Sequence, residues 1–579
     1  MKKLLIYLRD YKKECVLAPL FKMLEASFEL IVPLVMAVII DSGIAKSDKG
    51  LVVRMCGVLV LLGIIGLITS ITAQYFAAKA AVGFATNLRH ALFKHLQSLS
   101  FTEIDTLGTS TMITRMTSDV NQAQTGVNMV LRLFLRSPFV VFGAMIMAFT
   151  IDVKSALIFV VAIILLSIVV FGIMLINIPM LKDVQKKLDT VLNITRENLS
   201  GVRVIRAFCK EEEEIERFTR KNEELTAKQQ KSGSFSALMN PLTYVIINLA
   251  ILYLIWTGAL QVHAGVLTKG QVVSLYNYMS QILVELIKLA NLIITVNKSV
   301  ACANRIQDVF EIKTSMQYKE SLNENMKADN SNAVEFKHVA LTYSGAGDES
   351  LTDIDFTVRK GETVGIIGGT GSGKSSLVNM IPRFYDATKG EVLIDGINVK
   401  DYPREVLMKK VGIVLQKAVL FKGTIESNIR WGKKDATSED IAKAVEIAQA
   451  ADVVNAKGGT DAVIAQGGKN LSGGQRQRMT IARALVKKPD ILILDDSASA
   501  LDMATDARLR KSIKELDYNP TVFIVSQRTA AIQNADKIIV LDDGKIVGMG
   551  THDELIKNCE IYSEIYYSQY RKGGENNGR

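Results

Sequence analysis

Long apolar runs fill the first half of the chain, whereas short apolar runs alternate with polar segments in the second half. Six of the long runs reach the length that a helix needs to cross a bilayer, about 20 residues. They lie near residues 15–40, 52–76, 131–151, 155–180, 237–260 and 271–297. The pattern therefore predicts six transmembrane helices within residues 1–312.

The distribution of cations predicts how these helices are oriented. The segment 182–231 carries twelve lysines and arginines, whereas the three loops expected on the opposite side together carry five. Cationic loops stay in the cytoplasm, so this segment and the N-terminus are expected there. Lys2, Lys3 and Arg9 precede a first apolar run that is longer than a signal-peptide core and has no small-residue cleavage site behind it. No cleavable signal is therefore expected.

Two polar stretches rich in helix-forming residues, 77–130 and 181–236, predict helices that continue past the membrane into the cytoplasm. Each should turn back at a short polar break. The candidates are 101–112, which contains Gly-Thr-Ser, and 198–207, which contains Ser-Gly.

The second half of the chain changes character after a polar linker at 313–331. Over residues 332–570, short β-branched runs alternate with helical segments, which is typical of an α/β sheet covered on both faces. The polar tail 571–579 is predicted to be disordered.

Composition excludes several classes of protein. Of 579 residues, 49% are hydrophobic and 22% are charged, which excludes a disordered chain and an ordinary soluble enzyme. The net charge of +10 is explained by the cytoplasmic loops, so no nucleic-acid partner is expected. The five scattered cysteines have no spacing typical of a disulfide framework or a zinc site.

A phosphate-binding loop opens the second half. Residues 368–375, Gly-Gly-Thr-Gly-Ser-Gly-Lys-Ser, fit G-x-x-x-x-G-K-[ST] between a predicted strand and a predicted helix. In such a loop backbone N–H groups surround phosphates, Lys374 reaches the β and γ phosphates, and Ser375 binds Mg²⁺. Asp495 ends the apolar run Ile-Leu-Ile-Leu-Asp and supplies the carboxylate that such a magnesium site needs. ATP and Mg²⁺ are therefore the expected ligands.

Between these two motifs lies Leu471-Ser472-Gly473-Gly474-Gln475. With this signature the chain resembles the ATP-binding cassette (ABC) family. Six spans followed by a cassette resemble a half-transporter of the type I ABC exporter fold, in which a helical membrane domain is fused to an α/β P-loop nucleotide-binding domain. The resemblance implies a dimer in which the signature of one cassette completes the ATP site of the other. It also implies that the breaks at 101–112 and 198–207 are coupling helices that contact the cassettes.

The resemblance assigns further roles to single residues. Tyr343 is expected to stack on adenine, Gln416 to be the lid glutamine near Mg²⁺ and the attacking water, and Ser499–Asp502 to form the D-loop. The residues expected to bind nucleotide are Tyr343, Gly368, Gly371, Gly373, Lys374, Ser375, Ser376, Ser472, Gly473, Gly474, Gln475 and Asp502. Those expected to bind Mg²⁺ are Ser375, Gln416 and Asp495.

The chain departs from the family pattern at three places. Asp496 stands where the family has a catalytic Glu, Gln527 replaces the switch His, and Ala465–Gly468 replaces a Gly-Glu-Arg-Gly-like segment. An Asp places its carboxylate about one bond length short of the Glu position, and Gln cannot carry a proton. Asp496, Gln527 and Gln416 are therefore the expected catalytic positions of a slow ATP site.

These departures resemble the degenerate half of heterodimeric bacterial multidrug exporters, as do Val16–Ala26 and the run Leu131–Ala148. The resemblance implies a multi-pass subunit in the bacterial cytoplasmic membrane that exports amphipathic small molecules with a second half-transporter as partner. Two alternatives stay open. The chain could be a homodimeric exporter of lipid or peptide with slow ATPase, or a regulatory membrane subunit that binds ATP without transport.

Charged residues inside the spans are candidates for substrate binding, because they are costly in a bilayer. Glu25 and Glu29 lie on one face of the first span, and Glu285 and Lys288 lie one turn apart in the sixth. They could attract cationic amphipathic substrates. The alternative is that Glu25 and Glu29 pair with Lys22 or a neighbouring helix, and Glu285 with Lys288, for structural reasons.

Overall fold

The computed structural model describes residues 2–321 and 331–570. Of the expected linker, residues 322–330 lie outside the described part, as does the expected tail 571–579. The chain divides into two compact units. The membrane unit comprises Met1–Gln97 and Ser110–Ile312, and the cassette unit comprises Ser98–Thr109 and Lys313–Arg579.

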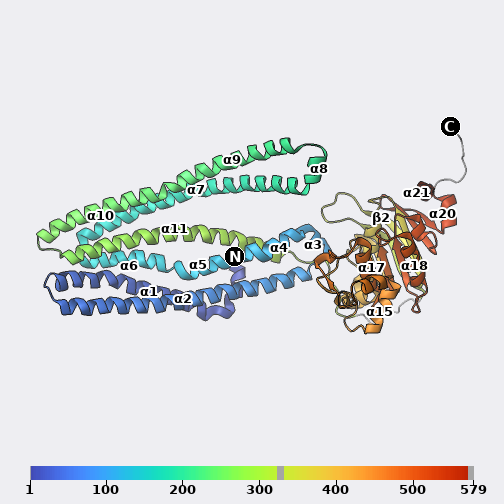
Figure 1. Cartoon of the computed structure of the whole chain (residues 1–579), viewed down its shortest axis with the longest axis horizontal. Helices are drawn as coiled ribbons and strands as arrows, with labels where there is room; N and C mark the ends of the chain where they lie inside the picture. Colours follow the sequence, from blue (N-terminus) through green and yellow to red (C-terminus); the bar gives the residue numbers. More distant parts are fainter. Residues whose placement is uncertain (1, 322–330, 571–579) are drawn as a thin grey trace. The chain divides into compact units, whose positions relative to one another are not determined.

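The membrane unit is entirely helical in its described residues, and its long helices run side by side (Figure 1). The helices are η1 (Lys2–Tyr11), α1 (Lys12–Val38), η2 (Ile39–Ile44), α2 (Lys49–Ser98), α4 (Thr109–Thr114), η3 (Arg115–Asp119), α5 (Val120–Leu133), α6 (Arg136–Ile151), α7 (Val153–Ser200), α8 (Val202–Ala207), α9 (Glu211–Ala237), α10 (Met239–His263) and α11 (Lys269–Glu311).

The six predicted membrane helices are confirmed. Six continuous helical stretches among the described residues are long and apolar enough to cross a bilayer, and each contains one predicted span. They are Lys3–Ile44, Lys49–Ser98, Thr109–Ile151, Val153–Ser200, Glu211–His263 and Lys269–Glu311. All six extend beyond the apolar run itself, because polar helix-forming sequence continues each of them.

Polar side chains fix where the membrane helices begin. Asp152 accepts a hydrogen bond from the Ser155 N–H at 2.7 Å and caps α7. Thr268 and Gln271 cap α11 reciprocally. Inside the unit, Tyr278 is fully buried and donates its hydroxyl to the Leu30 carbonyl at 2.6 Å, which joins α11 to α1. The free N–H groups and the buried hydroxyl are thus satisfied within the protein, as an apolar solvent requires.

The cassette unit contains two larger sheets and a short pair of strands. A four-stranded antiparallel sheet has the order β2-β1-β4-β5, and a six-stranded sheet has the order β12-β11-β3-β10-β9-β6. Its strands are β1 (Asn332–Leu341), β2 (Leu351–Arg359), β3 (Thr363–Gly368), β4 (Lys389–Ile394), β5 (Ile397–Asn398), β6 (Val411–Val414), β7 (Gly423–Thr424), β8 (Val463–Ile464), β9 (Ile491–Asp495), β10 (Thr521–Val525), β11 (Lys537–Asp542) and β12 (Lys545–Gly550).

In the six-stranded sheet, β6, β9, β10, β3 and β11 are parallel, and β12 is added antiparallel at the edge. The helices of the unit are α3 (Phe101–Leu107), α12 (Lys374–Met380), η4 (Val399–Asp401), α13 (Arg404–Lys410), α14 (Ile425–Ile429), α15 (Ser438–Ile447), α16 (Ala451–Ala456), η5 (Gln466–Gly468), α17 (Gly473–Leu485), α18 (Met503–Lys514), α19 (Thr529–Ile532), α20 (His552–Asn558) and α21 (Glu560–Gln569).

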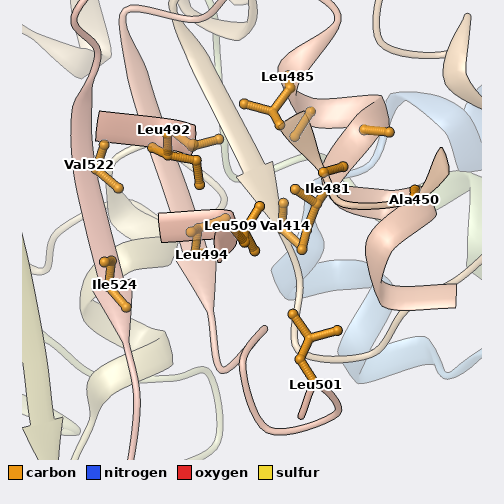
Figure 2. Packing of buried hydrophobic residues seen from close by; sticks show 14 of the residues in the cluster. Val414, Ala450, Ile481, Leu485, Leu492, Leu494, Leu501, Leu509, Val522 and Ile524 are labelled. Atoms are coloured by element: carbon orange, nitrogen blue, oxygen red, sulfur yellow. The ribbon is translucent and has the colours of Figure 1, made fainter. Parts of the chain in front are cut away.

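Figure 2 shows how the central strands pack against α17. Leu492 and Leu494 on β9 and Val522 on β10 face the same core as Ile481 and Leu485. Every residue of β9 and β10 is buried, because a parallel sheet is covered on both faces. The carboxyl ends of these parallel strands therefore sit at one rigid edge.

The alternating pattern predicted an α/β sheet covered on both faces, but not the additional antiparallel sheet. The chain also turns at Asp543-Gly544 and forms the β11–β12 hairpin. Of the two predicted breaks, 101–112 contains α3, which ends at Gly108 with a φ of 71°. The break at 198–207 contains α8, after α7 ends at Ser200.

Candidate nucleotide-binding site

The residues predicted to bind nucleotide largely come together. A cavity of about 650 Å³ lies at the carboxyl edge of the parallel strands in the cassette unit. The predicted residues that line it are Tyr343, Gly371, Gly373, Lys374, Ser375, Ser376, Gln416, Asp495, Asp496 and Gln527. They come from five separate parts of the chain, so the fold assembles a single site from them.

The phosphate-binding loop joins β3 to α12 in a conformation that depends on glycine. Gly373 has a φ of 92° where α12 begins, which other residues rarely adopt. A Cβ on Gly368 would lie 2.1 Å from the Leu541 carbonyl oxygen on β11. Gly368 therefore allows close packing behind the loop rather than lining the cavity.

Lys374 faces this cavity and is held by its own loop. Its Nζ donates to the carbonyls of Gly368 and Gly369 at 3.0 and 2.5 Å and to the Ser372 hydroxyl at 3.3 Å. Burial lowers the pKa of Lys374, and the nearby Asp496 and Asp495 carboxylates oppose that shift. A phosphate would supply the negative charge that the buried ammonium lacks.

Ser375 and Asp495 form the metal-binding candidate. The Ser375 hydroxyl donates to Asp495 Oδ1 at 3.0 Å. Burial raises the pKa of Asp495, and the neighbouring Asp496 adds to the shift. The described residues contain no cluster of three or more His, Cys, Asp or Glu suited to a metal ion. One hydroxyl and one carboxylate fit Mg²⁺, which keeps several waters and takes phosphate oxygens as its other ligands.

Tyr343 lies where the adenine is expected. Its hydroxyl donates to Ser376 Oγ at 2.9 Å, and Tyr385 packs edge-on against its ring at 5.0 Å. Burial raises the pKa of Tyr343, so the hydroxyl stays protonated. The ring is thereby held at the wall of the cavity, ready to stack on a base.

Asp496, Gln416 and Gln527 line the same cavity as Asp495. Gln416 Nε2 donates to Asp496 Oδ2 at 3.4 Å. Asp496 has a φ of 46°, a left-handed conformation that Asp tolerates, and its N–H donates to the Val525 carbonyl. Gln527 is the second residue after β10 and is exposed. These three residues offer a short carboxylate and two amides where water would attack a γ-phosphate.

The signature residues lie outside this cavity. Ser472 caps α17 by accepting a hydrogen bond from the Gln475 N–H, and the Gln475 side chain accepts one from the Ser472 N–H. Gly473 is the first residue of α17, and a Cβ on Gly474 would lie 2.8 Å from the Ala500 carbonyl oxygen. Asp502 caps α18 by accepting from the Thr505 N–H at 2.9 Å. The second half of the predicted binding set is therefore presented at a different place on the cassette.

The intramembrane charges are paired with one another. Glu25 accepts a hydrogen bond from Lys22 at 2.6 Å. Arg136, on α6, contacts Glu29 at 2.7 Å and Glu285 at 2.6 Å, and Lys288 contacts Glu285 at 2.8 Å. We call Glu29, Arg136, Glu285 and Lys288 the charge cluster. It borders a cavity of about 510 Å³ that Glu29, Glu285 and Lys288 line.

Sequence reasoning missed two contributions. Arg136 lies inside the predicted span 131–151 but was not among the candidates, because its partners Glu29 and Glu285 lie on other helices. Asp543 and Gly544 line the nucleotide cavity from the β11–β12 turn. An Asp-Gly pair between two β-branched runs is a hairpin signal that could have placed them there.

Comparison with known proteins identifies two family regions. Residues 15–286 match the ABC transporter transmembrane region, and residues 351–499 match the ABC transporter domain. An uncharacterized ABC transporter ATP-binding protein of Bacillus subtilis, YfiB, is 34% identical over 577 residues, which cover 99% of this chain and 100% of the relative.

Two further relatives carry names that describe an activity. The putative multidrug export ATP-binding/permease protein YgaD of Bacillus subtilis is 32% identical over 98% of this chain and 99% of the relative. The ATP-dependent lipid A-core flippase of Hahella chejuensis is 31% identical over 89% of this chain and 88% of the relative. A bacterial Atm1-family ABC exporter solved with ATP bound shares the fold with a TM-score of 0.79 at 22% identity, over 97% of this chain and 99% of that chain.

Proposed function

The chain belongs to the ABC exporter family, and from that premise we propose that it is one half of a heterodimeric exporter of amphipathic small molecules. In this proposal the chain spans the bacterial cytoplasmic membrane with its cassette in the cytoplasm. Its own ATP site holds MgATP and turns over slowly. Its signature completes a faster site on the partner half-transporter.

The observation that carries the proposal is the composition of the nucleotide cavity. Phosphate and metal contacts are present in Lys374, Ser375 and Asp495, whereas Asp496 and Gln527 occupy the end where water would be activated. Binding and turnover thus depend on different residues of one cavity. A site that keeps the first set and alters the second is suited to retaining ATP.

The chemistry follows from what each side chain can do. Lys374 stabilises negative charge on the β and γ phosphates. Mg²⁺, held by Ser375 and Asp495, would neutralise phosphate charge when bound. Asp496 has one methylene fewer than Glu and is held by Gln416, so it aligns water poorly. Gln527 can donate a hydrogen bond to the γ-phosphate but cannot transfer a proton.

The location of the signature supports a composite site. The signature is intact in sequence, and its residues Ser472 and Gly473 are exposed on the cassette. Backbone N–H groups at the beginning of α17 are suited to phosphate, because the helix dipole favours an anion there. We infer that these residues serve the ATP that is bound mainly by the partner.

We propose multidrug export as the transport activity, because a full-length relative is named for it. Lipid transport is the second candidate, because another relative is named a lipid A-core flippase. The charge cluster bears on this choice. Every carboxylate in it contacts a cation of the same cluster, so it offers a nearly neutral polar wall rather than a trap for cations.

ATPase measurements on purified protein in nanodiscs test the proposal. The full-length chain alone should bind MgATP and hydrolyse it slowly. Mixed with a half-transporter that carries Asp-Glu and a switch His at the matching places, it should form a pair with much faster, drug-stimulated turnover. An isolated chain as fast as the pair would contradict the slow site. Stimulation by lipid A and not by drugs would favour the second candidate.

A further inference from the structure

The last residue of the C-terminal helix contacts the segment that carries Gln527. Helix α21 ends at Gln569. The Nε2 of Gln569 donates to the Gln527 carbonyl at 2.7 Å. Its Oε1 accepts from the backbone N–H and the hydroxyl of Thr529 at 2.9 and 3.0 Å. A single side-chain amide thus uses its donor and its acceptor to fix the backbone on both sides of Arg528.

Helix α21 is a firm support for this amide, although Gln569 itself is exposed. Tyr562 is fully buried in the cassette core, and its hydroxyl is hydrogen-bonded to His552 Nδ1 at 2.7 Å. Ile561 and Ile565 pack against the same core. Thr529, which receives the amide, is also fully buried. The contact therefore joins two well-packed elements rather than two mobile surfaces.

The same segment continues to the D-loop. Arg528 donates to the Ser499 carbonyl and to the Leu501 carbonyl, each at 3.4 Å. Its N–H donates to Ser526 Oγ at 2.9 Å, which tightens the turn after β10. Residues 526–529 thus connect the end of α21 with the D-loop, and Gln527 lies in the middle of this connection.

We propose that Gln569 is a positioning residue of the ATP site. By holding the Gln527 carbonyl, it keeps the Gln527 side chain directed into the nucleotide cavity, where its amide donates to the γ-phosphate. This inference rests on the proposed function, because it requires nucleotide in that cavity. Since ADP has no γ-phosphate, Gln569 should affect the binding of ATP and leave that of ADP unchanged.

The test compares the affinities of the full-length chain in nanodiscs for MgATP and for MgADP. Each nucleotide displaces a fluorescent ADP analogue at low temperature. Gln569→Ala should weaken MgATP binding about threefold to tenfold, the effect of losing one ordinary hydrogen bond, and change MgADP binding less than about twofold. Gln569→Glu should act alike. Its carboxylate can accept from Thr529, but it cannot donate to the Gln527 carbonyl. Ser568→Ala is the matched control, because the Ser568 hydroxyl bonds only to Ile565 within the helix.

A double-mutant cycle separates positioning from general stability. If Gln569 acts through Gln527, then Gln569→Ala should change the ATP-to-ADP affinity ratio less than about twofold in a Gln527→Ala background. Equal weakening of both nucleotides, an unchanged ratio in Gln569→Glu, or additive effects would overturn the inference while leaving the ATP site intact. Failure of the unaltered chain to bind MgATP would instead overturn the proposed function and this inference with it.

Discussion

The nucleotide cavity and the charge cluster treat their charged groups in opposite ways. In the cavity, Lys374 contacts backbone carbonyls, and the Asp496 carboxylate accepts a long hydrogen bond, at 3.4 Å, from Gln416. In the charge cluster, Arg136 and Glu285 contact each other at 2.6 Å and are both buried. Charges that lack a strong partner in the protein are available to a ligand, whereas mutually paired charges hold helices together.

The largest effect should come from the signature, which we propose completes the ATP site of a partner. Ser472→Arg places a bulky cation in the signature and should nearly abolish the ATPase of the pair, while MgATP binding by this chain stays intact. The variant also removes the cap of α17, which costs about 1 kcal/mol. Thr437→Arg controls for that loss, because Thr437 caps α15 by the same reciprocal bonds. A Ser472→Arg pair with most of its activity would contradict the composite site.

The charge cluster should respond in stability rather than in ATP binding. Arg136→Met leaves the buried Glu285 without its closest partner, with Lys288 and Ser137 remaining, and should destabilise the membrane unit by up to about 3 kcal/mol. Unfolding in mixed micelles measures this loss. Arg217→Met is the matched control, since Arg217 forms an exposed pair with Glu197 at 3.5 Å and should have little effect. Equal stability of the two variants would show that the charge cluster does not hold α6 to α11.

These two regions also differ in how far sequence alone could define them. Gly368–Ser375 is contiguous, so its role is readable from spacing, and Asp495 follows from the apolar strand before it. Arg136 and Glu285 are 149 positions apart and meet only because α6 packs on α11. Gln569 is equally unreadable, because no local pattern links the end of a helix to a turn 42 residues earlier. The six spans and the parallel strands were predictable, since periodicity and length are local properties.

Lys374→Ala tests whether a charge in the nucleotide cavity serves ligand binding rather than stability. Removing the ammonium that faces the phosphates should weaken MgATP binding by the full-length chain about a hundredfold, since charge-assisted bonds to phosphate are among the strongest. Thermal stability should change little, because Lys374 donates within its own loop, to the Gly368 and Gly369 carbonyls and the Ser372 hydroxyl. Lys443→Ala, which removes an exposed cation paired with Asp517, should leave binding unchanged. A strong loss of stability in Lys374→Ala would mean that its charge serves the fold.

Lys487 is an exception to the contrast between charges available to a ligand and charges paired with one another. It packs against carbonyls away from the nucleotide cavity. Its Nζ donates to the Met408 and Val411 carbonyls at 2.8 and 2.5 Å, and burial lowers its pKa to about 8. The unfolded chain, with a pKa near 10.4, binds more protons between these values, so stability rises with pH there, by at most about 1.4 kcal/mol per pH unit.

Thermal unfolding of Lys487→Met between pH 8 and 10 should lack this rise relative to the unaltered chain. Lys488→Met is the control, since Lys488 is half-exposed and lies 3.8 Å from Asp440. If both variants follow the same pH profile as the unaltered chain, Lys487 is not protonated differently in the folded state.

The smallest effect is expected at Asp496. A variant at this position tests the proposed asymmetry between the two ATP sites most directly. Asp496→Asn keeps the side-chain length and the contact with Gln416, and removes only the charge. If the partner's Glu activates water, the steady-state ATPase of the pair should fall less than about threefold, whereas Glu→Gln in the partner should stop turnover. If the chain instead works as a symmetric homodimer, Asp496 is the base in both sites, and loss of a general base costs about 10²–10⁴-fold. Measuring Asp496→Asn in the pair separates the two assemblies, because a loss of about 10²–10⁴-fold there would mean that Asp496, and not a Glu of the partner, activates water.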